Sequence, residues 1–313
     1  MMTLALLSGT ASERLGAGVA DTLGIAPVPC EIIRFPDGEL HVELGQSVRG
    51  SDVFIFQATS PVADGHLMEL LLLADACRRA GAGQVTAVVP YFGYARQDRR
   101  AHGREAVAAR LVADLIQVSG VQRIVAVDVH TPAIEGFAGV PLEHLSAVHA
   151  LIEAVKPFCG DATVIVAPDL GAAHLAERYG QALGLPIAIV HKTRISGEEV
   201  RVSRITGDAR DRSPIIVDDM ISTGGTIAAA YHALLDAGCR PELAVVATHG
   251  LFVGNAVERL QSLPLRQVIV TDSVALSERQ PLPLKVVSLR GLLAEAVLRI
   301  HEQRSLADLI DHE

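Results

Sequence analysis

Two adjacent acids followed by small polar residues form the segment of this 313-residue sequence with the clearest chemistry. The apolar run 215–217 leads into the acids, and a helical pattern begins at the end of the segment. Hydroxyls and backbone N–H groups at a helix N-terminus can hold a phosphate. The acids can accept hydrogen bonds from sugar hydroxyls or orient a water bound to Mg²⁺. The segment therefore predicts a ribose 5-phosphate site made of Asp218, Asp219, Ser222, Thr223, Gly224, Gly225 and Thr226.

Two N-terminal segments carry side chains suited to a nucleotide. Residues 35–39 (Phe-Pro-Asp-Gly-Glu) predict a turn in which Phe35 can stack on a purine while the two acids accept hydrogen bonds. Residues 90–100 place aromatic rings beside arginines, of which Arg96 can fork onto phosphate oxygens. Taken alone, the first segment also fits an ordinary β-turn, and the second also fits a solvated surface.

Single polar residues at strand ends add three candidates. Only three of the 27 Lys and Arg residues are lysines, and one of them, Lys192, lies with Arg194 just after an expected strand. His130 and Asp169 each follow another expected strand. Polar groups at strand ends are where α/β folds bind ligands.

The elements that must position these residues alternate between short apolar runs and amphipathic helices. The expected strands are 52–58, 84–89, 123–127, 163–167, 187–190, 214–217, 243–248 and 267–270. The expected helices include 66–80, 105–119, 172–183, 226–237 and 255–260. This alternation predicts an α/β fold with mainly parallel sheets. Length and a turn-like region predict two domains, 1–146 and 147–313.

Composition excludes several classes of protein. Half of the residues are hydrophobic, which excludes a disordered chain. The net charge of −9 argues against a nucleic-acid partner bound by bulk charge. The longest apolar stretch is interrupted by acids, so we expect no membrane partner. Four dispersed cysteines without a metal-binding spacing favour reduced thiols and a cytoplasmic location.

The motifs together resemble those of ribose-phosphate diphosphokinases, the synthetases of phosphoribosyl diphosphate (PRPP). The resemblance runs along essentially the whole chain in the right order. It implies two similar α/β domains of phosphoribosyltransferase type with the active site between them. It also implies an ATP site, often shared across a subunit interface, formed by Phe35, Asp37, Glu39, Arg96, Gln97 and Asp98.

The resemblance assigns roles to the remaining candidates. It implies a metal-linked pair, His130 and Asp169, and a catalytic loop that begins with Lys192 and Arg194. It further implies a diphosphate loop made of Asp169, Leu170, Gly171 and Ala172. That loop departs from the family pattern, because Ala172 stands where a glycine is usual and the following arginine is absent.

The expected reaction is transfer of the β,γ-diphosphoryl group of ATP to the C1 hydroxyl of ribose 5-phosphate. AMP and PRPP are the expected products, with Mg²⁺ as the cofactor and a homo-oligomer as the expected assembly. Two alternatives stay open at this point. One is a non-catalytic regulatory subunit of the same family, and the other is a phosphoribosyltransferase, which would have no use for the ATP segments.

Overall fold

A computed structural model describes residues 2–194, 200–277 and 281–310 of the chain. For residues 192–194 and 200–203 it describes the backbone alone. Contacts divide the chain into two compact units. Unit 1 consists of residues 1–147, 273–275 and the segment from 288 onward, and unit 2 consists of residues 148–272 and 276–287.

Unit 1 is built on a five-stranded parallel sheet with the order β1-β4-β5-β6-β7. The strands are β1 (Leu4–Ser8), β4 (Asp52–Phe56), β5 (Gln84–Val89), β6 (Arg123–Val127) and β7 (Leu142–Leu145). A short 3₁₀ helix, Thr10–Ser12, follows β1. A separate antiparallel hairpin joins β2 (Cys30–Arg34) to β3 (Leu40–Leu44).

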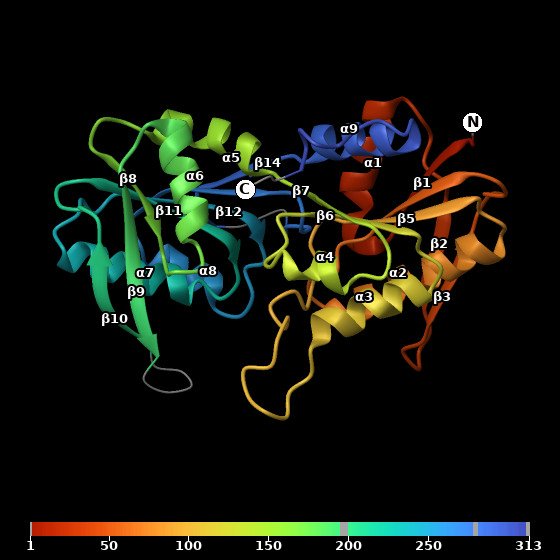
Figure 1. Ribbon diagram of the computed structural model, residues 1–313, viewed down its shortest axis with the longest axis horizontal. Helices are drawn as coiled ribbons and strands as arrows, with labels where there is room; N and C mark the ends of the chain where they lie inside the picture. The colour runs from red at the N-terminus through yellow and green to blue at the C-terminus, as the bar shows by residue number, and fades with distance from the viewer. Residues whose placement is uncertain (1, 195–199, 278–280, 311–313) are drawn as a thin grey trace. The chain divides into compact units, whose positions relative to one another are not determined.

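Helices cover both faces of this sheet (Figure 1). One face carries α1 (Glu13–Leu23) and α9 (Arg290–His301). The other face carries α2 (Ala63–Arg79), α3 (Ala108–Val118) and α4 (Ala133–Phe137). The central strands must therefore be apolar on both sides, and this explains their continuous runs of Val, Ile, Phe and Ala.

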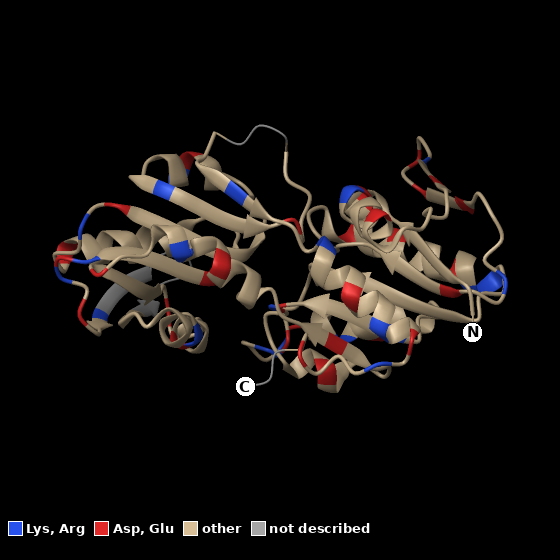
Figure 2. Cartoon of the chain, turned by 90° about the horizontal axis from the view of Figure 1, so that it is seen from above, with Lys and Arg blue, Asp and Glu red and all other residues tan. Residues whose placement is uncertain are grey.

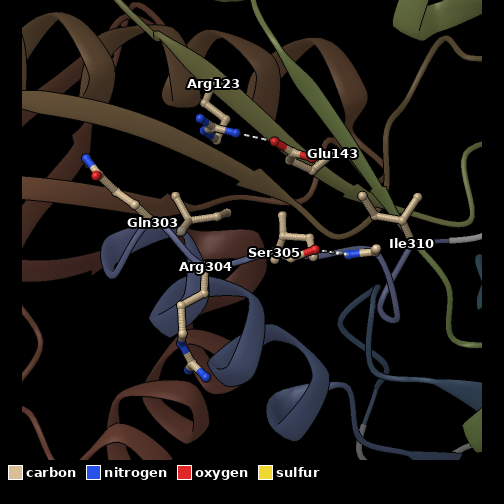
Figure 3. A pocket seen from close by; sticks show the side chains of 9 residues that line it. Arg123, Glu143, Gln303, Arg304, Ser305 and Ile310 are labelled. Carbon is tan, nitrogen blue, oxygen red and sulfur yellow. Dashed lines mark hydrogen bonds and ion pairs between the residues drawn. The ribbon is translucent and has the colours of Figure 1, made fainter.

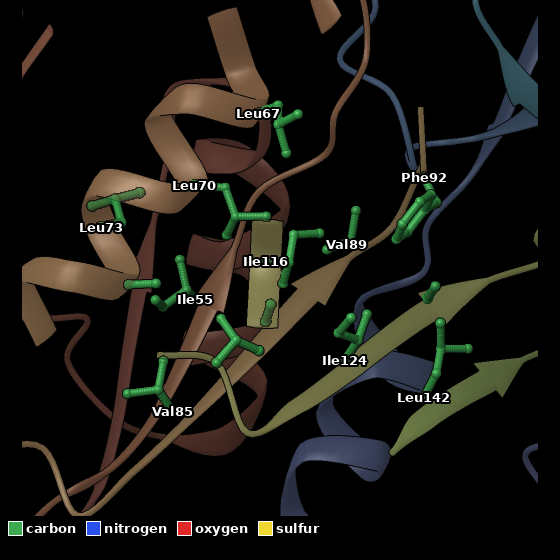
Figure 4. Packing of buried hydrophobic residues seen from close by; sticks show 14 of the residues in the cluster. Ile55, Leu67, Leu70, Leu73, Val85, Val89, Phe92, Ile116, Ile124 and Leu142 are labelled. Carbon is green, nitrogen blue, oxygen red and sulfur yellow. The ribbon is translucent and has the colours of Figure 1, made fainter. Parts of the chain in front are cut away.

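The core beneath α2 and α3 is a close-packed layer of aliphatic side chains (Figure 4). Ile55 and Val89 on the strands are fully buried against Leu70 and Leu73 of α2 and Ile116 of α3. Truncating such a residue to alanine typically costs about 2–5 kcal/mol of stability. The loops that follow these strands are thus carried on a rigid support.

The C-terminal segment packs on unit 1, whereas the sequence predicted that it belongs to a second domain spanning 147–313. Helix α9 packs against α1, and the Ser146 N–H donates to the Leu309 carbonyl at 3.1 Å. His301 Nδ1 lies 2.8 Å from Asp52 Oδ2. These contacts join residues far apart in the chain, so no local pattern could indicate them. The predicted boundary after residue 146 lies one residue before the first segment of unit 1 ends.

Unit 2 is built on a seven-stranded sheet with the order β10-β9-β8-β11-β12-β13-β14. All neighbouring strands are parallel except β10, which runs antiparallel to β9. The strands are β8 (Thr163–Ala167), β9 (Ile187–Arg194), β10 (Val200–Thr206), β11 (Ser213–Ile221), β12 (Leu243–Gly250), β13 (Leu265–Thr271) and β14 (Leu284–Val287). Both units confirm the predicted α/β fold with mainly parallel sheets.

The order of strands in unit 2 reverses between β8 and β11. From β8 the chain passes through α6 (Ala173–Leu183) to β9, then returns to the other side of β8 as β11. It continues through α7 (Gly225–Asp236) to β12 and through α8 (Ala256–Gln261) to β13. Helix α5 (Val148–Val155), which is followed by a 3₁₀ turn at Lys156–Phe158, lies with α6 on one face, and α7 and α8 cover the other (Figure 1). Such a reversal leaves a crevice at the carboxyl ends of the two strands.

Charged positions of both signs are interspersed along the elements of each unit (Figure 2). Of the helices in the part of the chain that the structure describes, none combines the length and the apolar character needed to cross a membrane.

The contact between α9 and the sheet of unit 1 can be tested at His301. His301→Ala removes the partner of the buried Asp52 carboxylate, whose Oδ1 already lacks a hydrogen-bond partner among the described residues. We expect the free energy of unfolding, measured by urea denaturation, to fall by about 1–3 kcal/mol. A double-mutant cycle with Asp52→Asn should show coupling between the two positions. Additive effects would show that the pair contributes no interaction energy.

Candidate functional site

The predicted phosphate loop lies between a buried strand and a helix, as the sequence indicated. Strand β11 ends at Ile221, and α7 begins at Gly225. Gly224 caps the helix with φ of +71°, a left-handed conformation that favours glycine. The first-turn N–H groups of a helix have no intrahelical partners, and the helix dipole adds positive potential there. The loop therefore has the backbone geometry of an anion site.

A neighbouring segment after β12 supports this loop from outside. The N–H groups of Leu251 and Phe252 donate to the Ile221 carbonyl at 2.9 and 3.1 Å, and the Val253 N–H donates to the Ser222 carbonyl at 3.1 Å. From α8, Arg259 Nη1 donates to the Thr223 carbonyl at 2.5 Å. The conformation of the loop thus depends on residues about thirty positions away in the sequence.

Three acids gather at the strand-order reversal. Asp218 and Asp219 lie near the end of β11, and Asp169 follows β8, which pairs with β11. Burial raises the pKa of Asp218 well above its usual value, and the negative charges of Asp219 and Asp169 raise it further. The Asp219 N–H donates to Asp218 Oδ1 at 3.0 Å. The structure therefore brings these three predicted residues together around one point of high negative charge.

The predicted diphosphate loop connects β8 to α6. Asp169 Oδ1 accepts a hydrogen bond from the Gly171 N–H at 3.0 Å, which closes a tight turn. Ala172 is buried and occupies the N-cap position of α6, so its methyl group points away from solvent. Leu170 is 63% exposed at the tip of the turn. This loop and the phosphate loop both follow the carboxyl ends of adjacent parallel strands, β8 and β11.

The predicted ATP residues of the hairpin form its tip. The Phe35 N–H donates to the Glu39 carbonyl at 2.8 Å, and the Glu39 N–H donates to Asp37 Oδ1 at 3.1 Å. Phe35 is 43% exposed, with its ring 5.9 Å from that of His41. The tip thus presents an aromatic face to solvent, as the sequence predicted for a ring that stacks on a base.

The second set of predicted ATP residues, 96–98, follows β5, and Thr59 anchors the start of the loop that carries them. The Thr59 hydroxyl accepts a hydrogen bond from the Gly93 N–H at 2.6 Å and donates one to the Tyr91 carbonyl at 3.2 Å. A Cβ on Gly93 would lie 2.4 Å from the Thr59 carbonyl oxygen, so this approach requires glycine. No hydrogen bond or ion pair within the described ranges joins this segment to the hairpin tip.

A second anchor holds the turn that carries His130. Asp128 adopts a φ of +38°, and its Oδ2 accepts a hydrogen bond from the Ala147 N–H at 3.1 Å. The Val129 N–H donates to Nε2 of His144, on β7, at 2.7 Å. His130 itself is exposed. Sequence reasoning missed His144, Thr59 and Arg259 because each acts on backbone atoms, which leave no motif.

The two predicted catalytic residues, Lys192 and Arg194, lie on β9. Their side chains are outside the part of the chain that the structure describes, as are residues 195–199. Strand β9 is the other neighbour of β8, so its end lies beside the diphosphate loop in the sheet.

A cavity of about 560 Å³ lies elsewhere in unit 1 (Figure 3). Arg123 and Glu143, which form an ion pair, line it together with residues of the segment that follows α9. The predicted site residues do not line this cavity.

Comparisons with known proteins identify relatives along the whole chain. A family model for the N-terminal domain of ribose phosphate pyrophosphokinase matches residues 4–120, and one for the phosphoribosyl synthetase-associated domain matches residues 201–311. The ribose-phosphate pyrophosphokinase of Caldanaerobacter subterraneus subsp. tengcongensis is 40% identical over 309 residues, which cover 98% of each chain. That of Staphylococcus saprophyticus subsp. saprophyticus is 41% identical over 312 residues, with 98% of this chain and 97% of the relative covered.

A solved structure agrees with these relatives. The phosphoribosylpyrophosphate synthetase of Mycobacterium smegmatis superposes with a TM-score of 0.90 at 38% identity, covering 96% of this chain and 99% of that one.

The charge at the strand-order reversal predicts a pH-dependent stability. Because the pKa of Asp218 is raised in the folded state, folding is favoured while this carboxyl is protonated, and that stability is lost as pH rises through the raised pKa. Asp218→Asn should therefore raise the melting temperature at about pH 8 and have a smaller effect at about pH 5. Asp236→Asn, at the exposed end of α7, is the control and should show no such trend. A pH-independent effect of Asp218→Asn would contradict the assignment.

Proposed function

Because the chain belongs to the ribose-phosphate pyrophosphokinase family, we propose that it transfers the β,γ-diphosphoryl group of ATP to the C1 hydroxyl of ribose 5-phosphate. The products are PRPP and AMP. The observation that carries this proposal is that the loop at the N-terminus of α7 follows Asp218 and Asp219 at the strand-order reversal of unit 2. A phosphate at the loop and a sugar diol at the acids fit this arrangement.

We propose that the substrates divide between the two units. Residues 222–226 bind the 5-phosphate, and Asp218 and Asp219 accept hydrogen bonds from the ribose hydroxyls. The diphosphate loop, residues 169–172, receives the transferred group. The hairpin tip (Phe35, Asp37, Glu39) and residues 96–98 bind ATP, the former by stacking and the latter by charge. A phosphoribosyltransferase would need the first set alone, so the exposed aromatic tip favours the kinase over that alternative.

The negative charge of the acids of unit 2 would attract a magnesium ion. A cation near Asp169, Asp218 and Asp219 would relieve their mutual repulsion, and Mg²⁺ prefers oxygen ligands. Among the described residues, no group of three or more His, Cys, Asp or Glu side chains is arranged to hold a metal ion. We therefore propose that Asp169 and His130 supply protein ligands and that substrate phosphates and waters supply the rest. When bound, the ion neutralises charge on the transferred diphosphate.

The main task left for the protein is to stabilise the charge that develops during the transfer. Phosphoryl transfer needs positioning and electrostatic stabilisation more than covalent catalysis. We propose that Lys192 and Arg194 provide this stabilisation. We also propose a cytoplasmic location and a homo-oligomer, since most soluble oligomers are symmetric assemblies of one chain. All four cysteines are unpaired thiols, which supports a reducing compartment.

The reaction itself is tested by incubating the protein with ATP, Mg²⁺ and ribose 5-phosphate. Formation of AMP and PRPP in equal amounts supports the proposal. The absence of both products would support the alternative of a non-catalytic subunit.

The ribose site predicts an unequal effect on the two substrates. Asp219→Ala or Thr226→Ala should raise KM for ribose 5-phosphate by roughly tenfold or more, because each removes a hydrogen bond to a charged or buried group. KM for ATP should change far less. Steady-state kinetics with each substrate varied in turn measures this, and an equal loss for both substrates would show that the loop is misassigned.

The role of Lys192 predicts an effect on turnover. If its charge acts mainly in the transition state, Lys192→Ala should lower kcat by about 10²–10³ while both KM values move much less. Lys192→Arg should recover part of the loss, because a planar fork replaces a compact ammonium poorly. A raised KM with unchanged kcat would instead make Lys192 a binding contact.

A further inference from the structure

We infer that Arg259 is a positioning residue of the 5-phosphate loop and supplies positive charge to the phosphate group that binds there. This inference rests on the proposed function of residues 222–226. Arg259 lies on α8, 36 residues beyond the carbonyl that it contacts, and it belongs to no motif that the sequence indicated.

The contact fixes Thr223, which lies between two parts of the loop that other contacts hold. Backbone bonds from 251–253 hold Ile221 and Ser222, and the helix holds the chain from Gly225 onward. Between them the Thr223 carbonyl accepts its hydrogen bond from Arg259 Nη1 at 2.5 Å. A carbonyl oxygen that turned toward the anion would repel it. The guanidinium thus holds this carbonyl in a fixed direction.

The position of the guanidinium also places its charge at the start of α7. A Cβ built on Gly225 would lie 3.4 Å from Arg259 Nη1, so the charge lies against the first helical residue. Side chains of α8 also pack on the loop, since a Cβ on Gly224 would lie 3.4 Å from Leu260 Cγ. Loop and α8 therefore form one packed unit.

The positive charge of Arg259 can act on an anion that binds at the loop. Over the described ranges, no carboxylate forms an ion pair with Arg259. The loop's own side chains are neutral, and the nearby Asp218 and Asp219 oppose a phosphate dianion. A guanidinium offers several N–H donors in a fixed fork, so it can hold the Thr223 carbonyl and still favour a phosphate.

The test compares Arg259→Gln with Arg259→Lys and with a matched control, Arg240→Gln. Arg240 is exposed in the loop before β12, at the opposite end of the sheet, and its loss changes the net charge equally. For Arg259→Gln we expect KM for ribose 5-phosphate to rise by roughly tenfold to a hundredfold, with KM for ATP close to wild type. Arg259→Lys should recover part of the affinity because it retains the charge. Arg240→Gln should leave both constants unchanged.

Amide hydrogen exchange of the ligand-free protein provides a readout that does not depend on catalysis. Peptides covering residues 222–228 should exchange faster in Arg259→Gln than in wild type, and Arg240→Gln should match wild type. If the wild-type protein forms no PRPP, the proposed function fails, yet the exchange comparison still decides the role of Arg259. Unchanged exchange, equal rises of both KM values, or the same effect in Arg240→Gln would overturn the inference.

Discussion

The proposed function requires unit 2 to bind phosphate where negative charge is already concentrated. Asp169, Asp218 and Asp219 meet at the ends of two adjacent strands, and burial with mutual repulsion raises the pKa of Asp218. A sugar diol is bound well by such acids, but a phosphate is repelled by them. The N-terminus of α7 and the guanidinium of Arg259 oppose this repulsion because both carry positive charge. The proposed function thus depends on placing charges of both signs at one end of the sheet, from segments that lie far apart in the sequence.

Unit 1 differs in that it must hold long polar loops in fixed conformations. The turns at the carboxyl end of its sheet are held by hydrogen bonds. Thr59 anchors the loop after β5, and His144 anchors the turn after β6, each through backbone atoms. Both anchors come from an adjacent strand or its extension. The buried sheet therefore fixes the conformation of the loops that carry the exposed residues. Such support is what precise positioning of reacting groups requires.

The sequence predicts those features whose chemistry is local. Strands buried on both faces show as continuous apolar runs, and the phosphate loop shows as two acids, small polar residues and a helix start. The structure confirms their order, with β11 and α7 on either side of the loop. The half-exposed hairpin and the short edge strands β7 and β14 lack such runs and were not predicted. The edge strands β1 and β10 were not predicted either. His144 and Arg259 were likewise not predicted, because they act on distant backbone atoms and such contacts leave no local pattern in the sequence.

The return of the segment after residue 287 to unit 1 has a consequence for the order in which the protein folds as it is made. Unit 2 interrupts unit 1 in the chain, so α1 leaves the ribosome long before α9, its partner. The part of α1 that packs on α9 and the carboxylate of Asp52 stay uncovered while all of unit 2 is synthesised. Unit 2 can complete its sheet first. The N-terminal unit, although it emerges earlier, is therefore the last to reach its final packing.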